Sequence, residues 1–198
     1  MVIRKKLVLA SASPRRKALL RQLGLHFEIK ESGVIEDETD GVHPEKYVTV
    51  LSKKKALAVA SGEENAIVIG ADTIVVIDNS ILGKPSSAQE AAEMLRTLSG
   101  RTHEVYTGFT IVDRPSNKFV SAVEVTKVTF RKLDADEITS YVASGSPMDK
   151  AGAYGIQDDY GAVFVEKVDG CFYNVVGFPL AKFYATLKTF LQHLGLNN

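Results

Sequence analysis

The feature that most constrains the fold is an almost continuously apolar run over residues 66–77. It is rich in valine and isoleucine, which favour strands. A half-buried strand alternates apolar and polar side chains, whereas a short run of this kind is typical of a strand covered on both faces. The run therefore predicts a central strand of a sheet that is buried on both sides.

One aspartate, Asp72, interrupts this run near its centre. An ionised carboxylate in an apolar strand must be paired, bound to a cation or neutralised. Gly70 and Ala71 remove side-chain bulk just before it, so we expect a ligand to approach closely there. Asp72 is therefore a candidate catalytic or cation-binding group, and the alternative is a structural aspartate bonded to neighbouring backbone N–H groups.

A second strong pattern lies near the N-terminus, where an apolar run at residues 7–10 breaks directly into a helix. Ser13 is a natural N-cap, and Pro14 suits the first helical position because its missing N–H would have no partner there. Leucines then recur at helical spacing until Gly24 provides a stop signal. The segment predicts a buried strand followed by a capped helix.

The start of this helix has the chemistry of a phosphate site. Unpaired N–H groups and the positive end of the dipole point toward an anion, and Arg15 and Arg16 add two forked charges beside the hydroxyls of Ser11 and Ser13. We expect an oligophosphate ligand. The alternative is an ordinary capped helix with solvated arginines.

The other segments alternate between helical and strand patterns. A strand is expected at 27–30 and helices at 44–60, from Ser87 to Gly100 and from Asp134 to Gly145; strands are expected at 103–112, 119–130 and 162–168, then a hairpin at Asp169 and Gly170 before a strand at 172–176, and a last helix starting near Pro179. Helices interleave with hairpins and long strands, which predicts an α/β fold with a mixed sheet. With no linker or repeat, we expect a single domain over residues 1–198.

Composition narrows the class of protein. Lys plus Arg and Asp plus Glu each total 24, so the formal net charge is zero, which argues against broad capture of nucleic acid or an anionic membrane. The single cysteine, Cys171, excludes an intramolecular disulfide and disfavours a thiolate metal site. No apolar stretch approaches the length of a membrane span. We expect a cytoplasmic protein.

Three charged segments are further candidates for ligand contacts. Lys84 follows the predicted central strand in a turn-rich segment, and Lys55 belongs to a lysine run whose alternative reading is a solvated helix face. Glu36 opens an acidic loop at residues 36–40 that has oxygen ligands for Mg²⁺, although such a loop is more often simply exposed.

Gln157 lies in a glycine-rich stretch, and its amide can both donate and accept, which suits the edge of a nucleobase. Glycine-rich stretches are also ordinary loops. The four histidines are scattered without ligand spacing, and we expect them to be structural or exposed. Walker-type, dinucleotide-binding, zinc-protease and serine-hydrolase motifs do not occur in the sequence.

Six ordered motifs together resemble the Maf family of nucleotide pyrophosphatases: Ser11-Ala-Ser-Pro-Arg-Arg16, Gly70-Ala-Asp-Thr73, Gly83-Lys-Pro85, Leu98-Ser-Gly-Arg-Thr-His103, Met148-Asp-Lys-Ala-Gly-Ala-Tyr-Gly-Ile-Gln157 and Val176-Gly-Phe-Pro-Leu180. The resemblance is to the branch that hydrolyses dTTP and UTP. The branch that acts on 7-methyl-GTP has tryptophan at the position of Arg15, glutamine at that of Thr73, and a different loop in place of residues 153–157.

The resemblance implies a role for each matching residue. Asp72 becomes the proton acceptor, and Arg15, Thr73 and Gln157 set the substrate preference. The remaining polar positions of the family match Ser11, Arg16, Lys55 and Lys84 for the phosphates and Glu36, with Asp72, for a Mg²⁺ or Mn²⁺ ion. The implied fold is similar to that of inosine triphosphate pyrophosphatases, with a twisted mixed sheet, flanking helices and two lobes around a central cleft, and it implies a possible homodimer.

One segment departs from the family pattern. The family usually has a glycine after the glutamine, whereas Asp158, Asp159 and Tyr160 lengthen the loop by about one residue and add two negative charges. These charges would favour a base that donates a hydrogen bond, such as cytosine.

The resemblance also leaves a second class of function open, a nucleotide-binding regulator of cell division or septum formation that acts through a partner. A pure sensor has no need for an acid beside the phosphates, where it would repel the ligand unless a metal intervened. Asp72 therefore favours the enzyme.

Overall fold

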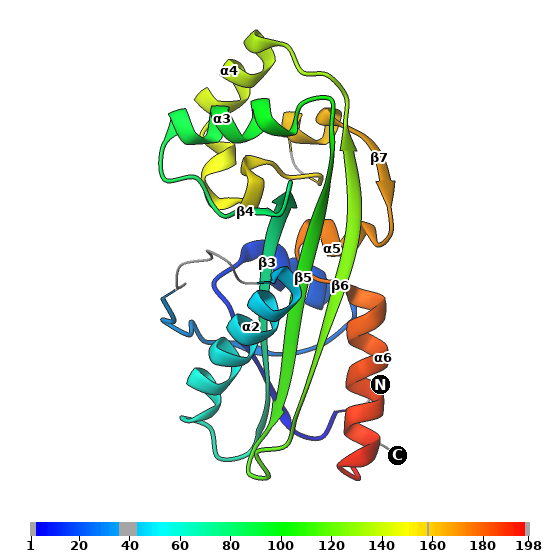
Figure 1. Ribbon diagram of the computed structural model, residues 1–198. Helices are drawn as coiled ribbons and strands as arrows, with labels where there is room; N and C mark the ends of the chain where they lie inside the picture. The colour runs from blue at the N-terminus through cyan, green and yellow to red at the C-terminus, as the bar shows by residue number, and fades with distance from the viewer. Residues whose placement is uncertain (1–2, 36–42, 158, 197–198) are drawn as a thin grey trace. The chain divides into compact units, whose positions relative to one another are not determined.

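A computed structural model describes residues 3–35, 43–157 and 159–196 (Figure 1). The strands are β1 (Lys6–Ala10), β2 (Glu28–Ile29), β3 (Ala66–Ile77), β4 (Ser80–Leu82), β5 (Thr102–Asp113), β6 (Phe119–Phe130) and β7 (Val165–Asp169). The helices are α1 (Pro14–Gln22), α2 (Pro44–Ala60), α3 (Ala88–Leu98), α4 (Ala135–Ala143), α5 (Phe172–Val176) and α6 (Leu180–His193), with 3₁₀ turns η1 (Ser146–Asp149), η2 (Ala151–Ala153) and η3 (Asp159–Phe164).

The sheet is mixed, as the sequence predicts. Its order is β2-β1-β3-β5-β6-β7, and β4 pairs with β3 outside this path. β1 runs parallel to both β2 and β3, while β4 is antiparallel to β3 and β7 is antiparallel to β6. Among the described residues, no helix combines the length and the apolar character that crossing a bilayer requires.

The chain forms two compact units. Unit 1 comprises Met1–Asp72, Thr107–Glu124 and Gly177–Asn198, and unit 2 comprises Thr73–Tyr106 and Val125–Val176. β3, β5 and β6 contribute residues to both units. The division matters for the site, because the chain passes from unit 1 to unit 2 directly after Asp72.

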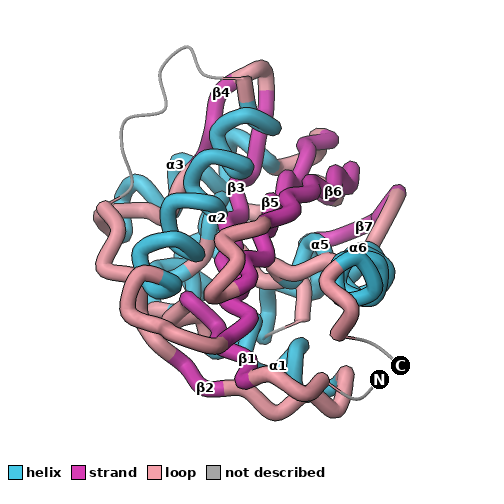
Figure 2. The backbone as a smooth tube through the Cα atoms, turned by 90° about the horizontal axis from the view of Figure 1, so that it is seen from below, coloured by secondary structure: helices cyan, strands magenta, loops and turns pink. Residues whose placement is uncertain are grey.

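In unit 1, helices cover both faces of the strands (Figure 2). α2 packs on one face, where Val8, Ala56, Val68 and Val112 belong to one buried apolar cluster. On the other face, Phe109 of β5 packs against the rings of Phe178 and Phe183, with centroids 5.8 and 5.6 Å away. The predicted burial of the central strand on both sides is confirmed for this part of the molecule.

One predicted strand is wrong. Residues 172–176, expected as the second arm of a hairpin, form the short helix α5. The buried Asn174 explains the difference, because its amide donates to the Val105 carbonyl (2.9 Å) and to Thr126 Oγ1 (3.0 Å). Thr126 Oγ1 also accepts from the Cys171 N–H at 3.1 Å. These tertiary bonds override the local turn signal.

The last helix starts near Pro179, as expected: Pro179 is the N-cap of α6 and Leu180 is its first residue.

Candidate active site

The predicted phosphate-binding loop and Asp72 meet at the end of β1 in unit 1. β1 and β3 are parallel, and their register places Ala10 opposite Gly70. Ser11 follows the last residue of β1, and β3 continues past that point, so Asp72 lies just beyond the end of its neighbour. The carboxyl ends of parallel strands are the usual place for ligand sites in α/β proteins.

The loop from β1 to α1 has the predicted capped geometry. Ser13 is the N-cap, its Oγ accepts from the Arg16 N–H at 3.4 Å, and Pro14 opens the helix. Ser11 Oγ accepts from the Ser13 N–H at 3.2 Å. The first-turn N–H groups and the half-buried Arg15 and Arg16 side chains therefore start from one fixed turn.

Arg16 is not a freely solvated arginine. Its Nε donates to the Gly177 carbonyl at 3.0 Å, and its Nη1 donates to Ser11 Oγ at 3.4 Å. The guanidinium thus ties the loop after β1 to the segment that precedes α6. The sequence carries no signal for Gly177 as a partner.

Helix α2 lies unusually close to the sheet. A Cβ added to Gly70 would lie 2.3 Å from the Ser52 carbonyl oxygen and 2.6 Å from the Ala56 nitrogen, and one added to Gly108 would lie 2.6 Å from the Val48 carbonyl oxygen. The expectation that Gly70 opens space for a ligand beside Asp72 is therefore wrong, because the α2 backbone fills that space. A glycine inside a strand pattern signals such a close approach.

This close approach pairs Asp72 with Lys55. The Lys55 Nζ lies 2.6 Å from Asp72 Oδ1, and the two side chains are only 11% and 7% exposed. Of the three expected states of Asp72 (paired, bound to a cation or neutralised), the structure shows pairing, and the alternative of a solvated Lys55 is wrong. Helical periodicity explains it, because Leu51, Lys55 and Val59 recur at the spacing of the buried face of α2.

A chain of hydroxyl groups fixes α2 next to this pair. Ser52 Oγ lies 2.9 Å from Thr110 Oγ1, which lies 2.8 Å from Ser121 Oγ. These bonds satisfy polar groups under α2 and set its position along β5 and β6. The carboxylate of Asp72 is therefore held by rigid, regular elements.

Three further predicted site residues, Thr73, Lys84 and Gln157, belong to unit 2. Thr73 is half-buried on β3, and Lys84 and Gln157 are exposed in loops. The Gly152 N–H donates to the Gly83 carbonyl at 3.0 Å, which ties the loop leading to Gln157 to the segment carrying Lys84.

The same loop also packs on β3. A Cβ on Gly152 would lie 2.8 Å from Val75 Cγ2. Val75 shares a face of the strand with Thr73, because side chains alternate along a strand. Unit 2 thus holds the segments that carry Thr73, Lys84 and Gln157 in contact with one another.

The predicted metal ligand Glu36 lies outside the described residues, as do the side chains of Asp158 and Asp159. Within the described ranges, no group of three or more His, Cys, Asp and Glu side chains is placed to hold a metal ion. Asp72 is the only predicted metal ligand whose surroundings can be described.

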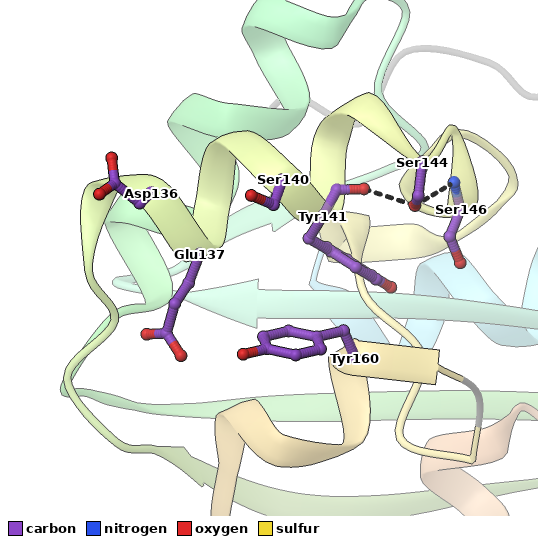
Figure 3. Close-up of a pocket in the computed structure, with 7 residues that line it drawn as sticks. All are labelled: Asp136, Glu137, Ser140, Tyr141, Ser144, Ser146 and Tyr160. Atoms are coloured by element: carbon purple, nitrogen blue, oxygen red, sulfur yellow. Dashed lines mark hydrogen bonds between the residues drawn. The ribbon is translucent and has the colours of Figure 1, made fainter.

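A pocket of about 750 Å³ lies elsewhere in unit 2, beside α4 (Figure 3). Its described lining has two carboxylates and no lysine or arginine: Asp136, Glu137, Ser140, Tyr141, Ser144, Ser146 and Tyr160. The Arg131 guanidinium holds Glu137 at 2.9 and 2.6 Å and lowers the pKa of that carboxyl to about 2. No predicted site residue is among the residues that line this pocket.

Comparison with known proteins gives the chain a family. The family model described as Maf-like protein matches residues 6–190. The chain belongs to the Maf-like family. The predicted membership is thereby confirmed.

Several Maf-like relatives are similar over nearly their whole length. The chain is 51% identical to the dTTP/UTP pyrophosphatase of Pelotomaculum thermopropionicum, covering 94% of this chain and 97% of the relative. It is 53% identical to that of a Thermoanaerobacter species, covering 92% and 95%. Among solved structures, a HAM1 protein from Coxiella burnetii matches with a TM-score of 0.46 and 16% identity, covering 95% of this chain and 98% of that chain.

Proposed function

We propose that this Maf-like protein hydrolyses dTTP and UTP to the nucleoside monophosphate and pyrophosphate. The names of its relatives support the substrates. The observation in the structure that carries the proposal is the buried Lys55–Asp72 pair just beyond the end of β1, next to the N-terminus of α1. The names of the relatives support a hydrolase and not a regulator of cell division.

The first part of the proposal concerns the triphosphate. Ser11, Arg15 and Arg16 surround the first turn of α1, where N–H groups and the helix dipole favour an anion. Lys55 and Lys84 are expected to add charge that stabilises the phosphate oxygens in the transition state. Because Arg16 is already oriented by Ser11 and Gly177, little reorganisation is needed when a phosphate arrives.

The second part concerns Asp72. In the proposed reaction, water attacks the α-phosphorus in line with the departing pyrophosphate, and Asp72 accepts the proton of that water. A buried carboxylate is oriented by its partner, and Lys55 fixes one oxygen of Asp72 at 2.6 Å. Its ammonium also offsets the charge that would otherwise repel phosphate.

A divalent metal ion is the proposed cofactor. Mg²⁺ is commonly bound through one or two carboxylates and the substrate phosphates, and Asp72 and Glu36 are the carboxylates predicted to hold it. A Mg²⁺ or Mn²⁺ ion would provide Lewis-acid neutralisation of the phosphate charge. A homodimer remains a prediction.

The third part concerns the base. Thr73 and Gln157 of unit 2, together with Arg15, are proposed to select thymine and uracil. These bases present an acceptor carbonyl where cytosine presents a donor amine, so a polar site matched to one leaves unpaired groups against the other.

The test is a panel of dTTP, UTP, CTP and 7-methyl-GTP with Mg²⁺ or Mn²⁺, in which pyrophosphate and orthophosphate are quantified separately. We expect pyrophosphate and a preference for dTTP and UTP. For the variant Asp72→Asn, the matched control is Asp78→Asn, because Asp78 is an exposed aspartate in the turn after β3 and pairs with Arg101. Release of orthophosphate with a nucleoside diphosphate, or a preference for 7-methyl-GTP, would contradict the proposal.

A further inference from the structure

A buried hydrogen bond in unit 2 joins β5 to the loop that leads to Gln157. His103 Nε2 lies 2.8 Å from Tyr154 Oη, and the two residues are 2% and 6% exposed. Phe130 contacts both rings edge-on, with centroids 5.0 Å from His103 and 4.7 Å from Tyr154. The three side chains form one aromatic cluster, within which the His103–Tyr154 bond is directional.

This bond is a poor source of stability. The Nδ1 atom of His103 is buried and has no hydrogen-bond partner among the described residues. A neutral histidine and a tyrosine bring one N–H and one O–H to a single contact, so one donor is left over in an apolar setting. Two phenylalanine rings would fill the same space without that cost. The contact is therefore better explained by what it orients than by the stability it adds.

The loop it orients has an irregular backbone. Gly152 and Ala153 both have positive φ angles, 67° and 60°. For alanine this conformation is strained, and it persists only where the surroundings fix it. The Gly152 N–H bond to Gly83 fixes the loop on one side, and Tyr154, bonded to His103, fixes it on the other.

Gln157 follows this anchor at a short distance along the chain. Two residues separate it from Tyr154, so the two Cα atoms, three steps apart along the chain, are at most about 11 Å apart. Gly155 and Ile156, which lie between them, are buried. A shift or rotation of Tyr154 is therefore expected to change the position of Gln157, because the two buried residues between them leave little freedom to compensate.

We propose that His103 is a positioning residue for base recognition. Its bond to Tyr154 sets the depth of the loop in unit 2 and thereby the place from which the Gln157 amide meets the base. This inference rests on the proposed function, because it requires Gln157 to contact the base.

The test compares His103→Phe and Tyr154→Phe, each of which keeps a ring and removes the bond. We expect each to raise KM for dTTP and to lower the dTTP-to-CTP ratio of kcat/KM by roughly tenfold, with kcat changed less than about twofold. The double variant is expected to be no worse than either single variant, since both remove the same bond. His103→Gln, which can still bond to Tyr154, is expected to restore part of the ratio.

Phe164→Leu is the matched control, because Phe164 is a buried ring of the same unit that packs against Phe130 and Tyr141. It is expected to lower Tm without changing the ratio. Hydrogen exchange at the amides of residues 153–157 gives a readout besides activity, and we expect it to be faster in His103→Phe than in Phe164→Leu.

The possible failures are distinguishable. Suppose that the wild type prefers dTTP and that His103→Phe and Tyr154→Phe keep this preference and only lower Tm, as Phe164→Leu does. This result would overturn the positioning role alone. A wild-type protein without pyrophosphatase activity or without preference among bases would overturn both this role and the proposed function.

Discussion

Asp72 and Gln157 are held in place in two different ways. Asp72 lies on a long buried strand and pairs with Lys55 of α2. Gly70 and Gly108 allow the backbone of this helix to contact the sheet. Gln157 lies in a loop whose backbone takes left-handed angles and which is fixed by the Gly152 N–H bond to Gly83 and by the buried His103–Tyr154 bond. The proposed proton acceptor thus depends on regular secondary structure, and the proposed base-reading residue depends on tertiary contacts of an irregular segment.

This difference suits the two tasks. Proton transfer needs a group held within a fraction of an ångström, which strands and helices provide. Base selection varies through contacts made by loops on a constant scaffold. Changes under α2 should therefore affect turnover of every nucleotide alike, whereas changes around Tyr154 should affect the choice among nucleotides.

The largest effect is expected for Gly70→Ala. The added Cβ would meet backbone atoms of α2 at 2.3 and 2.6 Å, so the helix must move. We expect a loss of about 3 to 4 kcal/mol in the free energy of unfolding and loss of activity toward all substrates. Urea denaturation measures the change in the free energy of unfolding. Gly62→Ala is the control, because its Cβ would meet only the Val59 oxygen at 3.8 Å; equal stability of the two variants would show that α2 is not held by this contact.

The next effect concerns the ion pair. Lys55→Met leaves the buried Asp72 carboxylate without its partner, and we expect a loss of about 3 kcal/mol in unfolding free energy. The exposed neighbour Lys54→Met is expected to change it by less than about 0.5 kcal/mol. The double variant Lys55→Met with Asp72→Asn should recover part of the loss, because no charge is then buried alone. If Lys55→Met is as stable as Lys54→Met, the pair does not organise unit 1.

A pH effect tests the anchor in unit 2. Burial lowers the pKa of His103 to about 4, and burial also raises the pKa of the facing Tyr154, which therefore stays protonated. The unfolded chain binds a proton at His103 more readily than the folded protein, so stability falls as the pH drops below about 6.5. Between pH 7 and pH 5 we expect His103 to contribute a loss of about 2 kcal/mol.

The measurement is the difference between wild type and His103→Phe in denaturation at several pH values. The variant is expected to lack this part of the slope. Parallel pH profiles for the two proteins would mean that His103 titrates normally and is not buried as a neutral ring.

The smallest effect separates backbone strain from contact at the loop. Gly152 and Gly145 both have positive φ, 67° and 75°, but only the Cβ on Gly152 would meet Val75, whereas that on Gly145 would meet nothing within 4 Å. Both alanine variants should lose about 1 kcal/mol from strain. Gly152→Ala should lose about 1 kcal/mol more and should also shift the dTTP-to-CTP preference; identical behaviour of the two would show that the loop tolerates displacement from β3.

The sequence predicts the regular half of this comparison well. The buried strand β3, the Ser13 cap and the helix α2 each depend on local sequence signals, and all three are confirmed. Periodicity does not show how closely a helix approaches a strand. The sequence therefore suggests a ligand at Gly70, where the structure places the backbone of α2.

The irregular half is harder to predict, because its contacts join residues distant in sequence. The strand expected at residues 172–176 is wrong because Asn174 bonds to Val105 and Thr126, and no local pattern indicates those partners. The four histidines are expected to be structural or exposed, and His103 is buried, but its link to Tyr154 depends on how β5 and the loop meet. The roles of Arg15, Thr73 and Gln157 stay predictions from the family resemblance.

The most direct test measures kcat/KM for dTTP and CTP side by side in the wild type, Asp72→Asn and Gln157→Ala. We expect Asp72→Asn to lower both values about a hundredfold or more and to keep their ratio, as expected for loss of a general base. Gln157→Ala should lower the value for dTTP selectively and bring the ratio toward one. Near wild-type activity of Asp72→Asn, or a dTTP preference that survives Gln157→Ala, would contradict the assignment of chemistry to Asp72 and of base choice to Gln157.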